Sequence, residues 1–185
     1  RRPRPLGCRD PARERGKRLV RALRKSPDEV ETYQAHAGQF LAEFEAVKDA
    51  KSVLFLARGV SAPVAHEGAL KLVELAYLPC LAYPAGEMKH GPIALLEEGS
   101  PVVVIAPNDS LKEKTLNSIH ECRARGAKII IIHEAGDSIA EEADISIAVP
   151  ATEPILTPML TVLPLQLIAY ETALALGCDV DRPRN

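Results

Sequence analysis

Five short segments of this chain are apolar at nearly every position, and they restrict the possible folds more than any other feature of the sequence. Examples are SVLFLA, PVVVIA and KIIIIH. A strand that is apolar at consecutive positions is buried on both faces, which is typical of a parallel sheet covered on two sides. The predicted strands are residues 52–57, 80–83, 101–106, 128–133 and 145–149.

Segments of helical character lie before, between and after these strands. Alternating strands and helices indicate right-handed crossover connections. The sequence therefore predicts an α/β fold, a doubly wound three-layer sandwich with a five-stranded parallel sheet. The last helix is more apolar than one sheet face requires, so we expect it to support self-association. The predicted helices are residues 27–47, 61–77, 86–96, 110–125, 137–142 and 154–176.

Three residues predict details of the helix ends. Ser61 is a good N-cap, because its hydroxyl can accept an early helical N–H. Gly126 follows a basic helix end and should take the left-handed conformation. Pro164 lies inside the last helix and should kink it unless its missing N–H donor is accommodated.

Size and composition exclude several classes of protein. The 185 residues suffice for one domain with a core, and 46% hydrophobic and 26% charged residues are ordinary for a globular protein. No uninterrupted apolar run approaches the roughly 18 residues of a membrane span. The net charge of -2 predicts neither a nucleic-acid partner nor a membrane partner.

The first 25 residues differ from the rest. They contain nine Arg and two Lys against only Asp10 and Glu14. A nucleic-acid-binding arm, an organelle address, a disordered end and a boundary artefact all fit this composition. We expect residues 1–25 to be a basic extension without fixed structure, and residues 26–185 to form the domain. The extension lacks the apolar stretch of a secretory signal.

The cysteines predict a cytoplasmic protein with reduced thiols. They are far apart in the sequence and none forms a C-x-x-C pair, so we expect no disulfide framework and no metal site. The four are Cys8, Cys80, Cys122 and Cys178.

The loop after the first strand is a candidate binding site. In open parallel sheets, ligands bind beyond the carboxyl ends of the strands. The loop 58–61 leads directly into a helix N-terminus, which favours anions. Arg58, Gly59 and Ser61 are therefore candidate substrate-binding residues, although an ordinary tight turn fits the same sequence.

Three charged residues share one face of the next helix. Glu67, Lys71 and Glu74 are spaced i, i+4, i+7. An exposed ladder of ion pairs fits this spacing. A proton shuttle fits it equally, because a cation tunes the pKa of a neighbouring carboxylate.

His90 is the histidine in the most suggestive position. It lies in the segment AGEMKHGP, soon after a predicted strand end. A histidine beside a cation suits acid–base chemistry near neutral pH. A surface or capping histidine is the alternative.

Several blocks in this order resemble one enzyme family, glucosamine-6-phosphate synthase. They are EGALKLVE at 67–74, AGEMKHGP at 85–92, VIAPN at 104–108, PLQL at 164–167 and GCDVDRPRN at 177–185. The resemblance covers about residues 26–185 and is to the second of two sugar isomerase (SIS) subdomains. It implies an SIS fold of the flavodoxin-like type.

The resemblance also implies a reaction. Enzymes of this family convert fructose 6-phosphate and glutamine into glucosamine 6-phosphate and glutamate without a metal or organic cofactor, and they act as homodimers. It implies that Glu74 moves a proton between C1 and C2 of the sugar, with Lys71 as its supporting cation. It implies that His90 assists ring opening in the neighbouring subunit's site.

The chain departs from the complete family pattern. It lacks the first SIS subdomain, whose Ser/Thr-rich loops hold the phosphate, the glutaminase domain and a tail lysine. We therefore expect a fragment that is inactive alone. A different SIS deglycase or isomerase, or a non-catalytic sugar-phosphate-binding module, are the alternatives. If Glu74 is the base, we expect it partly buried at the carboxyl edge of the sheet, near Lys71 and far from His90.

Overall fold

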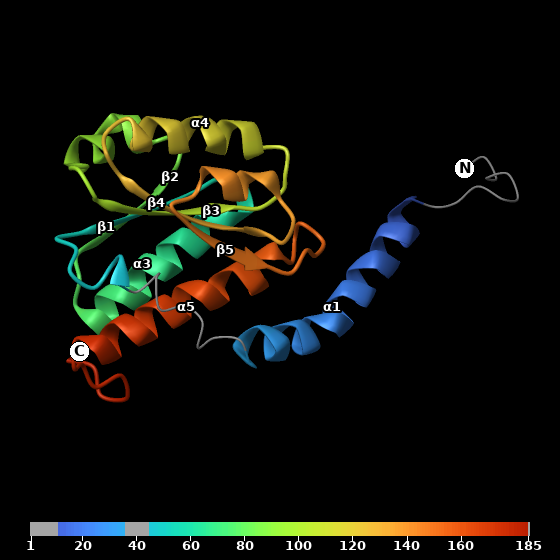
Figure 1. Cartoon of the computed structure of the whole chain (residues 1–185). Helices are drawn as coiled ribbons and strands as arrows, with labels where there is room; N and C mark the ends of the chain where they lie inside the picture. Colours follow the sequence, from blue (N-terminus) through green and yellow to red (C-terminus); the bar gives the residue numbers. More distant parts are fainter. Residues whose placement is uncertain (1–10, 36–44, 185) are drawn as a thin grey trace, which may run out of the picture.

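The computed structural model describes residues 11–35 and 45–184, and its centre is one parallel sheet (Figure 1). The strand order β2-β1-β3-β4-β5 is the flavodoxin-like order of a doubly wound sheet. This confirms the predicted fold class. The strands are β1 (Val53–Ala57), β2 (Cys80–Pro84), β3 (Pro101–Ala106), β4 (Lys128–Glu134) and β5 (Ile145–Val149).

Burial explains why some strands are apolar throughout. Every residue of β1 and β3 is buried, whereas most of β2, at one edge of the sheet, is only partly buried. Successive side chains of a strand point to opposite faces. Accordingly, Phe55 and Val103 belong to the core on one face, and Leu56 and Val104 to the core on the other.

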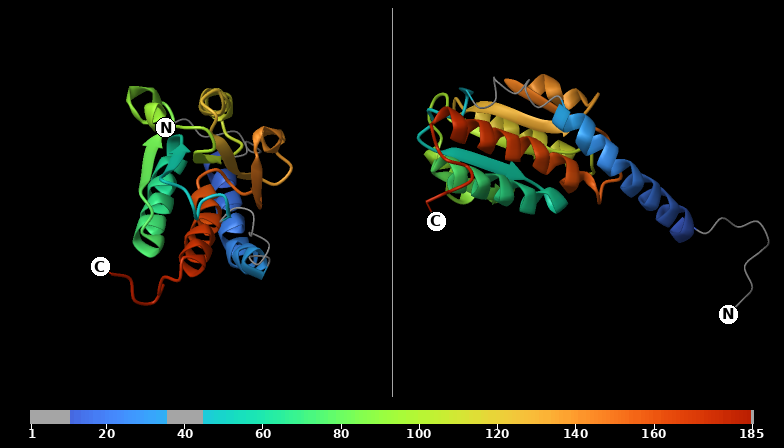
Figure 2. Two further views of the ribbon diagram at one scale, coloured as in Figure 1. Left: turned by 60° about the vertical axis from the view of Figure 1, so that its left-hand side comes forward. Right: turned by 90° about the horizontal axis from the view of Figure 1, so that it is seen from below.

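Helices cover both faces of the sheet. Figure 2 shows α3 (Ala62–Ala76) and α5 (Thr157–Ala175) side by side on one face. The other face carries α4 (Lys112–Arg123) and the 3₁₀ helix η5 (Ser138–Glu142). A Cβ atom at Gly68 would lie 2.8 Å from Cδ1 of Leu165, so this glycine permits the close packing of α3 on α5.

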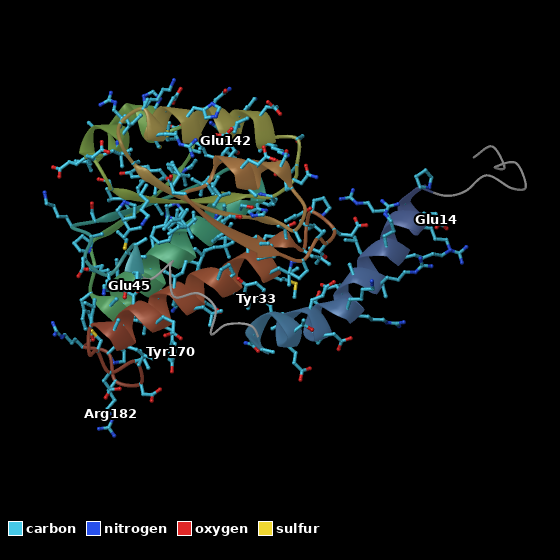
Figure 3. The ribbon with its side chains drawn as sticks, in the orientation of Figure 1. Glu14, Tyr33, Glu45, Glu142, Tyr170 and Arg182 are labelled. Carbon is cyan, nitrogen blue, oxygen red and sulfur yellow. The ribbon has the colours of Figure 1, made fainter. Side chains whose placement is uncertain are left out.

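The outer side of α5 remains partly exposed. Among the described helices, α5 alone has the length and apolar composition to cross a membrane, and 44% of it is buried inside the molecule. A core helix passes the same test. Figure 3 shows Tyr170 pointing away from the sheet, and its exposed fraction is 43%.

The segment after β2 differs from the prediction. Residues 86–96 form two 3₁₀ helices, η3 (Met88–His90) and η4 (Pro92–Leu95), and no α-helix. Gly91 between them has φ 149°, and Pro92 has no N–H to donate. These two residues break the segment.

The predicted helix ends had mixed outcomes. Gly126 has φ 79°, which confirms the left-handed prediction. The prediction for Ser61 was wrong: it holds the N-cap position, but its hydroxyl makes no capping hydrogen bond. Helix α5 continues without a break through the buried Pro164.

The N-terminal part is more helical than predicted. Helix α1 spans Pro11–Ala35 and so includes residues 11–25 of the predicted extension. Arg, Lys, Ala and Leu, which are frequent in this segment, are good helix formers. Tyr33 anchors the C-terminal half of α1 in the core, and Figure 1 shows the other half extending away from the sheet. Residues 1–10 and 36–44, including parts of the predicted extension and helix, lie outside the described residues.

Candidate active site

The candidate base lies at the amino edge of the sheet. Helix α3 starts beyond the carboxyl end of β1 and runs back to Ala76, shortly before β2 begins at Cys80. Its 15 residues span about 22 Å, more than the roughly 17 Å of a five-residue strand. Glu74, in the last turn, therefore lies near the amino edge, and the expectation of a carboxyl-edge position was wrong.

Glu74 forms a close ion pair with Lys71. Lys71 Nζ donates a hydrogen bond to Glu74 Oε2 at 2.8 Å, and it lies 3.8 Å from Glu67 Oε1. The side chains of Lys71 and Glu74 are 31% and 29% exposed, so the pair is neither fully solvated nor buried. The hydrogen bond to Glu74 raises the pKa of Lys71, against an opposing effect of burial.

This geometry suits proton transfer. A carboxylate can accept a proton from a substrate carbon and return it to a neighbouring carbon if its orientation is fixed. The ammonium group of Lys71 fixes one carboxylate oxygen of Glu74 through a hydrogen bond. Partial exposure leaves the pair within reach of a substrate.

The C-terminal segment packs beside this pair. Tyr77, one turn beyond Glu74, caps α3 in the left-handed conformation with φ 58°. The backbone N–H of Arg184 donates to the Tyr77 hydroxyl at 3.0 Å, and the Arg184 guanidinium lies 4.3 Å from the centre of the ring. Sequence analysis missed this contact, because residues 107 positions apart give no local signal.

A groove also lies at the amino edge. Its volume is about 760 Å³, and it is bounded by the starts of β1, β2 and β3, with Val73, the neighbour of Glu74, in its wall. The edge therefore offers space for a ligand or for another part of a larger protein.

His90 lies at the opposite edge. It ends η3, beyond the carboxyl end of β2, and its side chain is 76% exposed. Its ion-pair partner is Glu87, at 3.8 Å, and a pocket of about 520 Å³ adjoins it. The structure does not bring His90 and Glu74 together within one chain, as expected for a residue that serves a neighbouring site.

The three candidate binding residues of the first loop are not presented together. Ser61 is fully buried, and its hydroxyl has no hydrogen-bond partner. Gly59 allows the tight turn through φ 56°. The side chain of Arg58 instead reaches Ser118 on α4.

The thiols of Cys80 and Cys122 donate weak hydrogen bonds, to the carbonyl oxygen of Leu78 at 3.3 Å and to the sulfur of Met88 at 3.7 Å. In the described part of the chain, no group of three or more His, Cys, Asp or Glu could hold a metal ion. Cys80, Cys122 and Cys178 are free. Burial raises the pKa of Cys80 to about 12 and that of Cys122 to about 11, so neither is an activated nucleophile.

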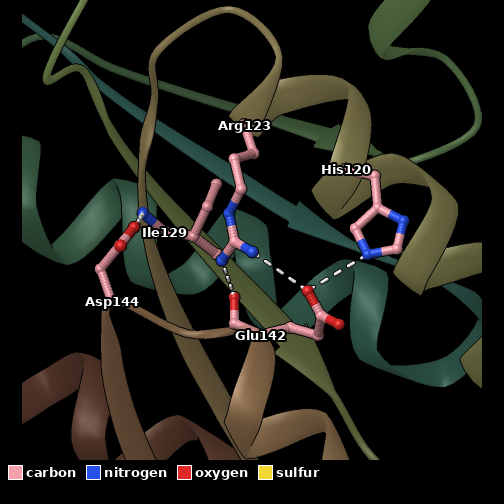
Figure 4. Close-up of polar contacts among 5 residues, drawn as sticks. All are labelled: His120, Arg123, Ile129, Glu142 and Asp144. Atoms are coloured by element: carbon pink, nitrogen blue, oxygen red, sulfur yellow. Dashed lines mark hydrogen bonds and ion pairs between the residues drawn. The ribbon is translucent and has the colours of Figure 1, made fainter.

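A second polar cluster has a structural role. Figure 4 shows Glu142 accepting contacts from His120 and Arg123 on α4, at 3.2 and 3.1 Å. Asp144 accepts the backbone N–H of Ile129 at 2.6 Å. These contacts tie the end of α4 and the start of β4 to the chain before β5.

Fold and site define this molecule as an α/β domain of the sugar isomerase type. The family model described as "SIS domain" matches residues 46–176, and the chain belongs to this family.

Relatives named glutamine–fructose-6-phosphate aminotransferase (isomerizing) are similar over most of the chain. A Thermus thermophilus protein is 50% identical over 175 residues, which is 94% of this chain and 29% of that protein. The Leifsonia xyli protein is 51% identical over 144 residues, 75% of this chain and 23% of that protein. The chain therefore spans less than a third of these relatives. The match to the Thermus thermophilus protein covers 94% of this chain. The unaligned part is shorter than 25 residues, so the match includes part of residues 1–25.

Solved structures show the same similarity. The C-terminal domain of glucosamine-fructose-6-phosphate aminotransferase from Francisella tularensis has a TM-score of 0.70 and 34% identity, covering 90% of this chain and 44% of that one. The tagatose-6-phosphate ketose/aldose isomerase from Escherichia coli has a TM-score of 0.72 and 22% identity, covering 85% of this chain and 45% of that one. The second similarity concerns the fold alone.

Proposed function

We propose that this chain provides the acid–base half of an enzyme that makes glucosamine 6-phosphate from fructose 6-phosphate and glutamine. In this proposal Glu74 moves a proton between C1 and C2 of the open-chain sugar, and Lys71 holds its carboxylate in place. The reaction needs no metal or organic cofactor. The observation that carries the proposal is the partly exposed Lys71–Glu74 ion pair at 2.8 Å, in a helix that matches the family's motif.

His90 assists ring opening in a second subunit. Its exposure of 76% and its place at the opposite edge from Glu74 support a role outside its own chain's site. A homodimer of the complete enzyme brings the two residues together. Exposed apolar side chains on α5, including Met159, Tyr170 and Leu174, support association through that helix.

In this proposal, other parts of a larger enzyme supply the phosphate cradle, the glutaminase and the tail lysine. The chain spans only 29% of the Thermus thermophilus relative, which leaves room for such parts. We therefore expect the isolated chain to form no glucosamine 6-phosphate, with glutamine or with ammonia as the nitrogen source. We place the reaction in the cytoplasm, where the free thiols stay reduced.

A chimera tests the proposal directly. The chain replaces the matching 29% of the Thermus thermophilus relative, and glutamine hydrolysis and glucosamine 6-phosphate formation are assayed separately. Glu74→Gln should lower sugar formation by about 100-fold or more, because it removes a general base, and should leave glutamine hydrolysis in place.

Glu113→Gln is the matched control, since Glu113 is an exposed carboxylate on α4 and far from the motif. It should change neither rate. Retention of sugar formation by the Glu74→Gln chimera would overturn the assignment of the base.

A further inference from the structure

Arg58 follows β1 directly and turns toward the α4 face of the sheet. Its Nη2 donates a hydrogen bond to the Ser118 hydroxyl at 3.0 Å. Ser118 is 3% exposed, and its hydroxyl also lies within hydrogen-bond distance of the carbonyl oxygens of Lys114 and Ala85. The guanidinium is therefore held by a buried group that is itself held by two elements.

Among the described residues, this cation has no counter-charge. No Asp or Glu in residues 11–35 or 45–184 pairs with Arg58, and its Nε is buried without a hydrogen-bond acceptor. An arginine cannot relieve the cost of burying its charge by losing a proton, whereas a buried lysine or histidine can. A half-buried cation that keeps its charge is unfavourable until an anion offsets it.

Arg58 lines a pocket with excess positive charge. The pocket has a volume of about 300 Å³ and lies between the loops after β1 and β2 and the side of α4. Lys114, Lys89 and Glu121 also line it, and Lys89 pairs with Glu121 at 2.6 Å. Arg58 and Lys114 remain as two cations without a carboxylate partner in the described structure.

The pocket is preorganised around the guanidinium. A Cβ atom at Gly86 would lie 3.2 Å from Nη1 of Arg58, so the absence of a side chain lets the guanidinium lie against the β2 loop. The N–H of Ala85 donates to the carbonyl of Ala57 at 2.8 Å, which ties the two loops together. A ligand would therefore meet a cation whose position is already fixed, which lowers the entropy cost of binding.

We propose that this pocket binds a phosphate group, either of a small phosphorylated metabolite or of inorganic phosphate. A planar guanidinium beside an ammonium complements the charge and geometry of a phosphate dianion. The pocket is at the carboxyl edge of the sheet, opposite the Lys71–Glu74 pair, so it is a second site that does not depend on the proposed catalytic role. Four of its lining residues, Lys114, Asn117, Ser118 and Glu121, lie along one side of α4.

Calorimetric titration of the isolated chain tests the site. Inorganic phosphate, fructose 6-phosphate and unphosphorylated fructose are the three probes, with ionic strength held constant by sodium chloride. Both phosphates should bind saturably with one site per chain, and fructose should not bind. Affinity for both phosphates identifies the phosphate group as the recognised feature, whereas affinity for fructose 6-phosphate alone contradicts recognition of inorganic phosphate.

Variants locate the site. Arg58→Gln should weaken phosphate binding about tenfold or more, as expected for loss of a charge-assisted hydrogen bond. Lys114→Gln should weaken binding by a smaller factor, and because Lys114 is exposed, this variant keeps the test valid if Arg58→Gln does not fold. Arg125→Gln, an exposed arginine in the turn before β4 at the amino edge, is the control and should bind normally.

The outcome is independent of the proposed enzyme. Glu74→Gln should leave the binding of inorganic phosphate unchanged, so a failed chimera would not affect this site. Absence of saturable phosphate binding overturns the proposal and indicates that Arg58 meets a carboxylate from another part of a larger protein. Equal binding by the original chain, Arg58→Gln and Lys114→Gln also overturns it.

Discussion

The two edges of the sheet differ in whether their charged side chains are paired. At the amino edge, Lys71 and Glu74 neutralise one another at 2.8 Å. At the carboxyl edge, the hydrogen-bond partner of Arg58 among the described side chains is the uncharged Ser118. A neutralised pair is suited to moving protons, whereas an uncompensated cation is suited to holding an anion. The proposed phosphate site at Arg58 follows the carboxyl-edge rule for ligand sites in parallel sheets, whereas the proposed base Glu74 does not.

The two ends of β4 offer the largest measurable contrast in stability. Gly126, at the amino edge, and Gly136, at the carboxyl edge, have φ 79° and 82°. A Cβ atom at Gly126 would lie 2.0 Å from Glu98 Oε2 and 3.0 Å from Glu98 Cα, whereas one at Gly136 would meet nothing within 4 Å. Gly136→Ala should cost about 1–2 kcal/mol of unfolding free energy from backbone strain alone.

Gly126→Ala should cost more, about 2–4 kcal/mol, because overpacking adds to the same strain. Urea denaturation of both variants measures the difference. Equal losses would show that Glu98 moves aside freely and that the amino edge is not tightly packed.

Asp137 should make the carboxyl edge sensitive to acid. Burial works to raise the pKa of Asp137, but the N–H of Ile139 and the ammonium of Lys112 outweigh it and lower that pKa. A carboxyl with a lowered folded-state pKa contributes stability above its unfolded pKa of about 3.9, and this contribution is lost as pH falls through the folded value.

Asp137→Asn should therefore lower the free energy of unfolding by about 1–2 kcal/mol at neutral pH. It should also make that free energy fall less steeply below about pH 4. Thermal unfolding from neutral pH to strongly acidic pH measures both effects, with the exposed Glu113→Gln as control. An unchanged acid limb in Asp137→Asn would show that other carboxylates govern acid unfolding.

Replacing Ser61 should change the free energy of unfolding by a smaller amount, and the sign of the change tells whether its hydroxyl caps the helix. An N-cap hydroxyl that bonds to the helix would cost about 1 kcal/mol on replacement by alanine. The Ser61 hydroxyl is buried without a partner, so Ser61→Ala should be neutral or stabilising by up to about 1 kcal/mol. A clear loss of melting temperature would restore the capping role predicted from sequence.

Tyr77→Phe should give the smallest effect on global stability. It removes the hydroxyl that accepts the Arg184 N–H but keeps the ring under the guanidinium. We expect a loss below about 0.5 kcal/mol, because the contact is exposed, with faster hydrogen exchange at the Arg184 amide. Unchanged exchange would mean that the C-terminal segment does not depend on this contact.

Local sequence was sufficient for most of the sheet. The five predicted strands end within one residue of the observed ends. Runs that are apolar throughout indicate strands covered on both faces, as β1 and β3 are. The left-handed conformation of Gly126 could also be predicted from the sequence, because a glycine that directly follows a helix commonly adopts it. The break at Gly91-Pro92 was visible too, but the apolar residues around it favoured a helix.

The spacing of Lys71 and Glu74 placed them on one helix face, and it could not choose between an exposed ladder and a shielded pair. Exposures near 30% depend on how α3 packs against the sheet and its neighbours. The pair lies near the amino edge because α3 is longer than β1 and the pair is in the last turns of α3. Sequence patterns report which residues share a face, but not how far a helix runs along the sheet.

The sequence by itself determined the order of strands and helices, the identity of the buried strands and the family motif around Glu74. Only the tertiary structure decided that Ser61 is buried without a partner, that Arg58 meets Ser118 and that Arg184 meets Tyr77. Hydrophobic periodicity is a pattern over a few neighbouring residues, so the local sequence is enough to detect it. The Arg58 and Arg184 contacts join residues 60 and 107 positions apart, and they exist only after the sheet has brought their elements together.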